Sequence, residues 1–250
     1  MGELQYSIFR YAPSLVSGEK INLAAVFYYE TGYREFFSVS KWNRVLAFDD
    51  TLNIPLLKAL MKDIKDEVEA SLNNPDFNLI HFCQQYDSEF HFDKCESIFI
   101  VSEAELSAQI EEIQRMYFQF EFDVKRRPMR KDQRRFLCKL LESKQIKYVK
   151  EPKKCGNYDA EIKYDYTFND FGVVFFDFNG KKIDNKTMNK VKAWAWNAQN
   201  SKDNLKLLIL YDLADERRTD VRPALEILRS VTNQAINIHD GFSDVLQLIS

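Results

Sequence analysis

The alternation of apolar and polar positions predicts three antiparallel strands at the start of the chain. Residues 4–11 and 20–30 alternate as expected for strands that bury one face. Gly32 interrupts the second run, and residues 33–39 form a third strand-like run directly after it. Because the three runs follow one another closely, we expect them to pair as an antiparallel meander.

Helical spacing follows this predicted meander. Apolar residues recur with a helical period over residues 56–72, and Asp50-Thr51 offers an N-cap for that helix. Asn73-Asn74-Pro75 ends it, because proline cannot continue a helix. The next runs predict two strands and a second helix, at 78–82, 97–101 and 102–120.

The second half of the chain predicts a different sheet. Residues 158–168 alternate over their whole length, with Tyr164, Tyr166 and Phe168 on the face expected to be buried. Residues 172–178 are almost wholly apolar, as a central strand should be. Strands at 145–149, 205–210 and 236–238 are expected around them, with helices at 187–199, 223–231 and 242–249. This order predicts an α+β chain with an antiparallel sheet in the first half and a mixed sheet in the second.

A basic segment separates the two halves. Residues 125–135 contain seven basic residues among eleven, and the apolar positions after them are helical in spacing. We therefore expect an N-terminal domain at 1–121, a basic linker helix at 122–144 and a C-terminal domain at 145–250. Like charges one turn apart destabilise a helix unless something anionic compensates for them. Phosphate groups are one candidate, which makes these the expected nucleic-acid-binding residues: Arg126, Arg127, Arg130, Lys131, Arg134 and Arg135. Acidic helices of the first half are the alternative compensating surface.

Two short motifs near the start carry a resemblance to a known family. Arg10-Tyr11-Ala12-Pro13, and then the segment that begins Gly18-Glu19, resemble the opening of the bacterial domain-of-unknown-function family three-zero-three-seven. The match covers residues 6–72. The resemblance implies no established activity, but it implies an origin in bacterial or mobile-element genomes. On physical grounds alone, Arg10, Glu19 and Asn22 are expected to hold a strand corner through hydrogen bonds.

Carboxylates in the second half suggest a metal-dependent chemistry. Asp165 and Asp177 lie on two successive predicted strands, and Lys181 and Lys182 follow them. This arrangement resembles the PD-(D/E)xK nucleases, in which two carboxylates hold Mg²⁺ and a lysine steadies the attacking water. The pattern departs from that family because Asn179 stands where its lysine should be. We therefore expect a nuclease-like domain that holds no metal and is inactive, and the active Mg²⁺-dependent nuclease is the alternative.

The same motif has a second possible phase, and a second resemblance overlaps it. In this phase Glu161 and Lys163 have the (D/E)-x-K spacing of the nuclease motif. The carboxylates of Asp159 and Glu161, however, are too close in sequence to lie on separate strands. The run 164–209 is weakly similar to an uncharacterised family of phages and mobile elements. Within that run, Trp194 and Trp196 cannot share one helix face, so we expect one in the core and one half exposed, where it could stack a base.

Composition narrows the remaining choices. The chain has 250 residues, 45% hydrophobic, with a net charge of −3, so any attraction to nucleic acid must come from a local patch. No apolar run is long enough for a membrane span, and the cysteines lack zinc-site spacing, so we expect a cytoplasmic protein with free, buried thiols. The predicted function is a non-enzymatic interaction protein of a mobile element or phage-defence system, which binds nucleic acid or a nucleic-acid enzyme. An inhibitor that uses its acidic surfaces is a further alternative.

Overall fold

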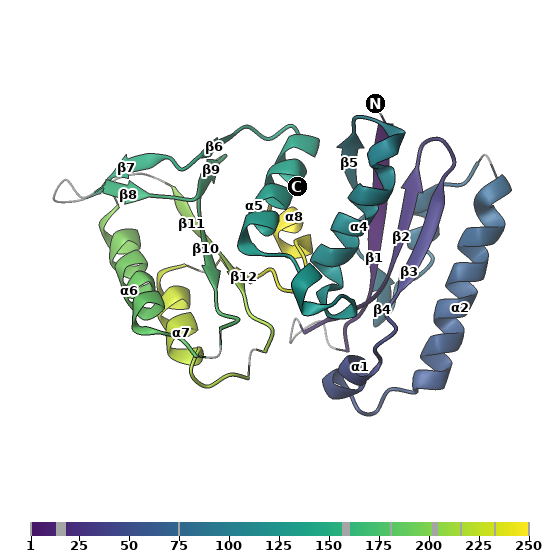
Figure 1. The fold of residues 1–250 in the computed structure, drawn as a ribbon, viewed down its shortest axis with the longest axis horizontal. Helices are drawn as coiled ribbons and strands as arrows, with labels where there is room; N and C mark the ends of the chain where they lie inside the picture. Colours follow the sequence, from purple (N-terminus) through teal and green to yellow (C-terminus); the bar gives the residue numbers. More distant parts are fainter. Residues whose placement is uncertain are drawn as a thin grey trace. The chain divides into compact units, whose positions relative to one another are not determined.

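The computed structural model describes residues 2–13, 19–74, 76–156, 161–180, 182–201, 205–215, 217–232 and 234–249. The chain divides into two compact units, Met1–Met129 and Arg130–Ser250 (Figure 1). The fold is α+β, with an antiparallel sheet in the first unit and a mixed sheet in the second, as the pattern predicted. In the part of the chain that is described, no helix is both long and apolar enough to cross a bilayer.

The first unit is built on the predicted meander. The antiparallel pairing of β1 with β2, and of β2 with β3, confirms it. Two strands that follow later in the chain pair with the other edge of β1. The strands of this sheet are β1 (Gly2–Tyr11), β2 (Ile21–Tyr29), β3 (Arg34–Ser38), β4 (Phe90–Phe92) and β5 (Glu96–Ile100).

Helices cover this sheet, and two of them differ from the prediction. They are α1 (Asn43–Phe48), α2 (Ile54–Ala70), α3 (Leu79–Cys83) and α4 (Leu106–Tyr117), with short 3₁₀ turns at Ser71–Asn73, Glu103–Glu105, Gln119–Glu121 and Val124–Arg126. The N-cap of α2 is Asn53 rather than Asp50-Thr51, because its side chain accepts the Leu56 N–H. The strand predicted at 78–82 is wrong, since Asn78 caps the helix α3 there.

Polar side chains hold the corner between β1 and β2, as predicted for Arg10 and Asn22. The strand register shifts between Phe9 and Arg10, and Arg10 then lies opposite Asn22. The Arg10 guanidinium lies 3.0 Å from the Asp93 carboxylate, and Asn22 Nδ2 donates to the Tyr117 carbonyl at 2.8 Å. Both side chains are almost fully buried, so these partners offset the cost of desolvating them.

The second unit contains a five-stranded mixed sheet in the order β12-β11-β10-β9-β6. Strands β10, β11 and β12 are parallel, whereas β9 is antiparallel to both of its neighbours. The strands are β6 (Tyr148–Lys150), β9 (Tyr166–Phe168), β10 (Phe171–Asp177), β11 (Lys206–Asp212) and β12 (Ala235–Asn237). A separate antiparallel pair is formed by β7 (Lys153–Cys155) and β8 (Glu161–Lys163).

Helices lie on both faces of this mixed sheet. They are α5 (Arg130–Ser143), α6 (Asn185–Asn200), α7 (Arg222–Val231) and α8 (Ser243–Ile249). Helices α6 and α7 connect the parallel strands and bury their apolar faces with Val174 and Phe176 of β10. Helix α5 belongs to the opposite face, because the Arg134 guanidinium lies over the Phe175 ring, 5.5 Å from its centre. Successive side chains of β10 therefore point to α6 and to α5 in turn.

The prediction of one continuous eleven-residue strand at 158–168 is wrong. Residues 157–160 lie outside the described part, and the rest forms two strands, β8 and β9, separated at Tyr164 and Asp165. The break sends the tyrosines to different faces of the sheet: Tyr164 packs on Trp194 of α6, and Tyr166 packs on Phe175. The expectation for the tryptophans is confirmed, because Trp194 is buried and Trp196 is 45% exposed.

The cysteines that the structure describes form no disulfide. Cys83 and Cys138 are buried, as expected for thiols in a hydrophobic core. Cys95 is only partly buried and packs at the edge of the first unit's core. The side chain of Cys155 lies outside the described part of the chain.

Candidate nucleic-acid interface

Strands β9 and β10 separate halfway along β10, and polar side chains occupy the space between them. Backbone pairing of the two strands covers only Phe171 to Val173 of β10. Beyond it, the Phe175 N–H donates to Asp165 Oδ2 at 2.7 Å, and the Phe175 carbonyl accepts from Lys190 Nζ at 3.0 Å. Side chains here take the place of a neighbouring strand. We call this place, with Arg130, Arg134, Asp165 and Lys190 around it, the β9–β10 opening.

Two arginines from the first turns of α5 bind the carboxylate in the opening. Arg130 Nη2 lies 3.3 Å from Asp165 Oδ2, and Arg134 Nη2 donates to Asp165 Oδ1. Asp165 is only 19% exposed, and burial lowers the pKa of both guanidiniums, which still stay protonated. Part of the like-charge repulsion predicted for α5 is therefore compensated within the same unit, rather than by the acidic helices considered from the sequence.

A lysine of α6 reaches the same opening from the other face of the sheet. Lys190 Nζ lies over the Phe176 ring, 4.6 Å from its centre, while it donates to the Phe175 carbonyl. Burial, and then the charges of Arg130 and Arg134, lower its pKa to about 8. Sequence reasoning missed this residue. The available signal was its position one helical turn before Trp194, which places it on the inner face of α6.

The outer side of α5 and the β6 edge of the sheet form a basic groove of about 680 Å³. Six basic residues and one acidic residue line it, together with two tyrosines and a cysteine. The lining is Arg130, Lys131, Arg134, Arg135, Cys138, Lys139, Glu142, Tyr148, Lys150 and Tyr166. We call this surface the basic groove. Arg130 and Arg134 belong both to it and to the β9–β10 opening, so the two are continuous.

The remaining two predicted binding residues lie in the first unit. Arg126 pairs with Glu111 at 2.7 Å and lies over the Phe122 ring, 5.4 Å from its centre. Arg127 donates to the Phe122 carbonyl and lies over the Phe120 ring. An acidic helix does compensate for Arg126, as the alternative interpretation predicted. The structure thus brings four of the six predicted residues, Arg130, Lys131, Arg134 and Arg135, to one groove.

The carboxylate pair suggested for a nuclease is arranged differently from the expectation. Asp177 was expected to be the more buried of the two, but it is exposed, and it accepts the Asn179 N–H at 2.9 Å. Its direct neighbour across the parallel ladder is Asp212, whereas Asp165 faces Phe175. Lys182 is exposed, and Lys181 lies outside the described residues. Among the described side chains, no group of three or more His, Cys, Asp or Glu could hold a metal ion.

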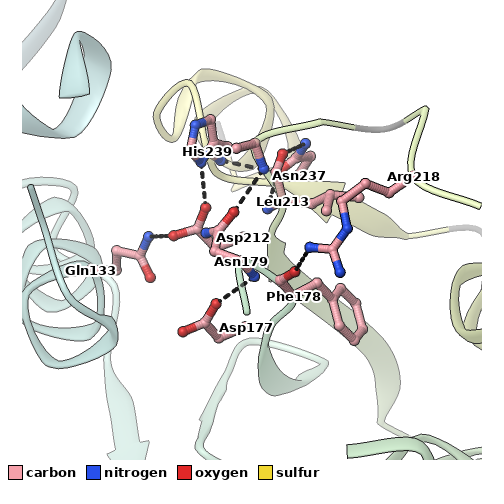
Figure 2. A network of polar contacts seen from close by, with 10 residues as sticks. Gln133, Asp177, Phe178, Asn179, Asp212, Leu213, Arg218, Asn237 and His239 are labelled. Atoms are coloured by element: carbon pink, nitrogen blue, oxygen red, sulfur yellow. Dashed lines mark hydrogen bonds and ion pairs between the residues drawn. The ribbon is translucent and has the colours of Figure 1, made fainter. Parts of the chain in front are cut away.

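A buried carboxylate lies at the end of β11, beside the groove helix (Figure 2). Asp212 is 6% exposed, and its two oxygens contact His239 Nδ1 and Gln133 Nε2, each at 2.5 Å. Burial acts to raise the pKa of Asp212, but the hydrogen bond and charge of His239, with hydrogen bonds from Asn179 and Gln133, lower it below its ordinary value. Sequence reasoning missed this cluster, although Asp212 ends an apolar strand and His239 follows another.

This cluster fixes the position of α5 on the sheet. Gln133 lies between Arg130 and Arg134 along the helix, so its bond to Asp212 sets the rotation that presents both arginines to Asp165. Asn179 joins the neighbouring strand ends, because its Oδ1 accepts the Ala214 N–H at 2.8 Å. Asn237 holds the segment after β11 through Leu213, as Figure 2 shows. Asn179 therefore has a structural partner in the place where a nuclease lysine was considered.

Comparison with known proteins gives no match for the chain. No family model matches it, and neither a curated protein nor a solved structure does. The family resemblances drawn from short motifs therefore stay predictions.

Proposed function

We propose that this chain binds nucleic acid, without cleaving it, by holding a phosphate backbone in the basic groove. The observation that carries the proposal is the excess of basic over acidic side chains in one groove of a chain whose net charge is −3. A protein of the same overall sign as nucleic acid needs such a local patch to attract it. Lysine and arginine side chains that neutralise phosphates release condensed counterions, which supplies affinity independent of base sequence.

The groove favours a single strand as the ligand. Tyr148 is half-buried at its wall, and a base could stack on its ring in the place where Lys150 Nζ lies over it. Tyr166 is only 8% exposed, so it supports Tyr148 from below rather than offering a second stacking face. A groove that combines cations with one accessible ring suits a flexible backbone whose bases can turn inward.

Reversing charge in the groove should weaken binding and its salt dependence together. Lys131 and Lys150 are exposed, so Lys131→Glu combined with Lys150→Glu should leave the fold intact. We expect about 100-fold weaker binding of a single-stranded oligonucleotide of about 12 nucleotides. The slope of log affinity against log salt should fall by about 1.4, since each lost phosphate contact contributes about 0.7 on single strands. Fluorescence anisotropy at several salt concentrations measures both quantities.

A matched control separates the groove from overall charge. Lys62→Glu with Lys65→Glu changes the net charge by the same amount on exposed positions of α2 in the first unit. This control should bind nearly as wild type does. Equal losses in the two double variants, or a wild-type protein that binds neither DNA nor RNA strands at low salt, would overturn the proposal.

One observation favours the nuclease alternative. Apart from the inserted β7–β8 pair, the order α5, β6, β9, β10, α6, β11, in which β11 is parallel to β10, agrees with the plan considered from the sequence. The chemistry of the opening argues against it, because two guanidiniums already bind Asp165. A carboxylate neutralised in this way is a poor ligand for a divalent cation.

We therefore expect no cleavage of DNA or RNA in the presence of Mg²⁺ or Mn²⁺. Incubation with single-stranded and duplex substrates, followed by denaturing electrophoresis, measures this directly. Cleavage that disappears in Asp177→Ala, while circular dichroism shows an intact fold, would contradict the expectation. Such a result would make the chain an enzyme and give Lys181, Lys182 or Lys190 the role of the missing lysine.

The biological setting stays a prediction from the resemblances. A role in a bacterial mobile element or a phage-defence system, with a nucleic-acid enzyme as protein partner, agrees with binding of nucleic acid. Inhibition of such an enzyme through acidic surfaces would instead leave the basic groove unused. The charge-reversal variant distinguishes these two, because only the first requires Lys131 and Lys150.

A further inference from the structure

We infer that the β9–β10 opening receives a terminal phosphate monoester of the strand that lies in the basic groove. The inference rests on the proposed function and specifies that the protein recognises the phosphorylated end of the bound strand. It follows from three cations that meet at one place, from donors there that have no protein partner, and from the continuity of the opening with the groove.

The three cations reach the opening from two helices on opposite faces of the sheet. Arg130 and Arg134 come from α5 and contact Asp165, while Lys190 comes from α6 and binds the Phe175 carbonyl. The Phe175 backbone joins these groups, because its N–H binds Asp165 and its carbonyl binds Lys190. The two sides can meet only because β9 stops pairing with β10 at Val173. The gap in the ladder is thus what creates the cluster.

The charge at the opening matches a monoester better than a diester. One carboxylate, Asp165, contacts the cations, so the group keeps an excess of about two positive charges at neutral pH. The next carboxylate, Asp177, is exposed and accepts the Asn179 N–H, and its charge acts on Arg130 from a greater distance, where water screens it. A terminal phosphate carries about −1.5 to −2 at pH 7, whereas each internal phosphodiester carries about −1.

Hydrogen-bond donors remain available for the oxygens of such a group. The Nε atoms of Arg130 and Arg134 are buried and have no hydrogen-bond partner among the described residues. Lys190 has three donors, of which the Phe175 carbonyl takes one. A phosphate monoester offers three terminal oxygens, and charge-assisted bonds from guanidinium and ammonium groups are among the stronger ones in proteins.

The position of the opening explains why a strand end should occupy it. Arg130 and Arg134 line the basic groove, whereas Lys190 does not, so Lys190 lies beyond the groove lining. Because Arg130 and Arg134 belong to both the groove and the opening, we place the last phosphate of a backbone held in the groove beside Lys190. Burial, and then the like charges of Arg130 and Arg134, lower the pKa of Lys190 to about 8, which leaves it charged at neutral pH. Such perturbed groups gather where a ligand of opposite charge binds.

The test compares three single-stranded oligonucleotides of the same sequence, about 12 nucleotides long. One carries a 5′-phosphate, one a 3′-phosphate, and one has hydroxyl groups at both ends. We expect one phosphorylated form to bind about 10-fold more tightly than the hydroxyl form in anisotropy titrations at about pH 7. Lys190→Gln should remove this preference and change the affinity of the hydroxyl form less than about 2-fold. Lys190→Arg should keep part of it, and Lys186→Gln, exposed on the same helix, should keep all of it.

A second measurement needs no variant and covers the case in which Lys190→Gln fails to fold. The preference of the wild-type protein for the phosphorylated form should fall as pH rises through about 8, because Lys190 loses its charge while the neighbouring arginines keep theirs. Asp165 and the phosphate stay ionised over that range. The hydroxyl form serves as the internal reference at every pH.

The outcomes separate the two proposals. Equal binding of all three oligonucleotides by the wild-type protein overturns this inference and leaves the proposed function standing. A preference that survives in a folded Lys190→Gln variant also overturns it, because the phosphate would then bind elsewhere. Binding of none of the three overturns the proposed function and this inference together.

Discussion

Replacing Asp212 with alanine is expected to lower the free energy of unfolding of the second unit by about 3–5 kcal/mol. The carboxylate is 6% exposed and contacts both His239 and Gln133, so its removal leaves buried polar groups without their partner. The same change releases α5 from the end of β11. The proposed affinity for nucleic acid should therefore fall with stability, although Asp212 does not line the basic groove.

The three tryptophans allow this effect to be measured on the second unit alone. Trp42 lies in the first unit, and Trp194 and Trp196 lie in the second. Urea denaturation in a Trp42→Phe background, followed by fluorescence, therefore reports on the unit that contains Asp212. Asp170→Asn is the matched control, because Asp170 and its partner Lys206 are both exposed and such pairs contribute up to about 1 kcal/mol. A loss from Asp212→Ala no larger than that of the control would refute this account of the cluster.

The contribution of the Asp212 carboxylate to the unfolding free energy should depend on pH in the acidic range. The pKa of Asp212 is lower in the folded state than its ordinary value, so the folded state binds fewer protons there. Its contribution is therefore complete above about pH 5 and is lost as pH falls below the unfolded pKa of about 3.9 towards the folded one. The difference in unfolding free energy between wild type and Asp212→Ala should shrink over that acidic range.

Replacing Asp165 with alanine is expected to cost about 2–3 kcal/mol of unfolding free energy. The change removes the partner of two guanidiniums and the acceptor of the Phe175 N–H at once. The cost should be smaller than for Asp212, because the Asp165 carboxylate is 19% exposed and water can reach the arginines. Asp165→Asn keeps an acceptor for the backbone N–H and should recover about half of the loss.

A double-mutant cycle isolates the arginine contribution. Asp165→Asn and Arg134→Gln, alone and combined, should show a coupling energy of about 1–2 kcal/mol in the same tryptophan background. Additive losses would mean that Asp165 stabilises the unit through Arg130 and the Phe175 N–H and not through Arg134. The cycle also indicates whether the carboxylate could be released for a metal ion, since a strong coupling to Arg134 opposes that.

Periodicity was sufficient to predict most of the elements and the class of the fold. The meander of the first half and the central strand at β10 have clear two-residue alternation or continuous apolar character, which depend on local sequence. Asn78 shows where this approach failed. The apolar run after it is short enough for either a strand or a helix, and only the cap bond to the His81 N–H decides for α3.

The candidate site was harder to predict from the sequence, because it depends on where the backbone pairing of β9 with β10 ends. The clustering of basic residues on α5 was visible as like charges one turn apart. The partner of Arg130 and Arg134 was not, because Asp165 follows a break between β8 and β9 that interrupts an otherwise regular alternation. Lys190 and Asp165 are 25 positions apart in the chain and meet only through the Phe175 backbone.

The double membership of Arg130 and Arg134 has an evolutionary consequence. Both side chains line the groove and also bind Asp165, so a substitution that alters ligand preference there also destabilises the unit. Lys131 and Lys150 are exposed and line the groove only, so they can vary at little cost in stability. Homologues should therefore vary at the positions of Lys131 and Lys150 and keep the arginines at the positions of Arg130 and Arg134. Related proteins could then bind strands of different composition through the same two arginines.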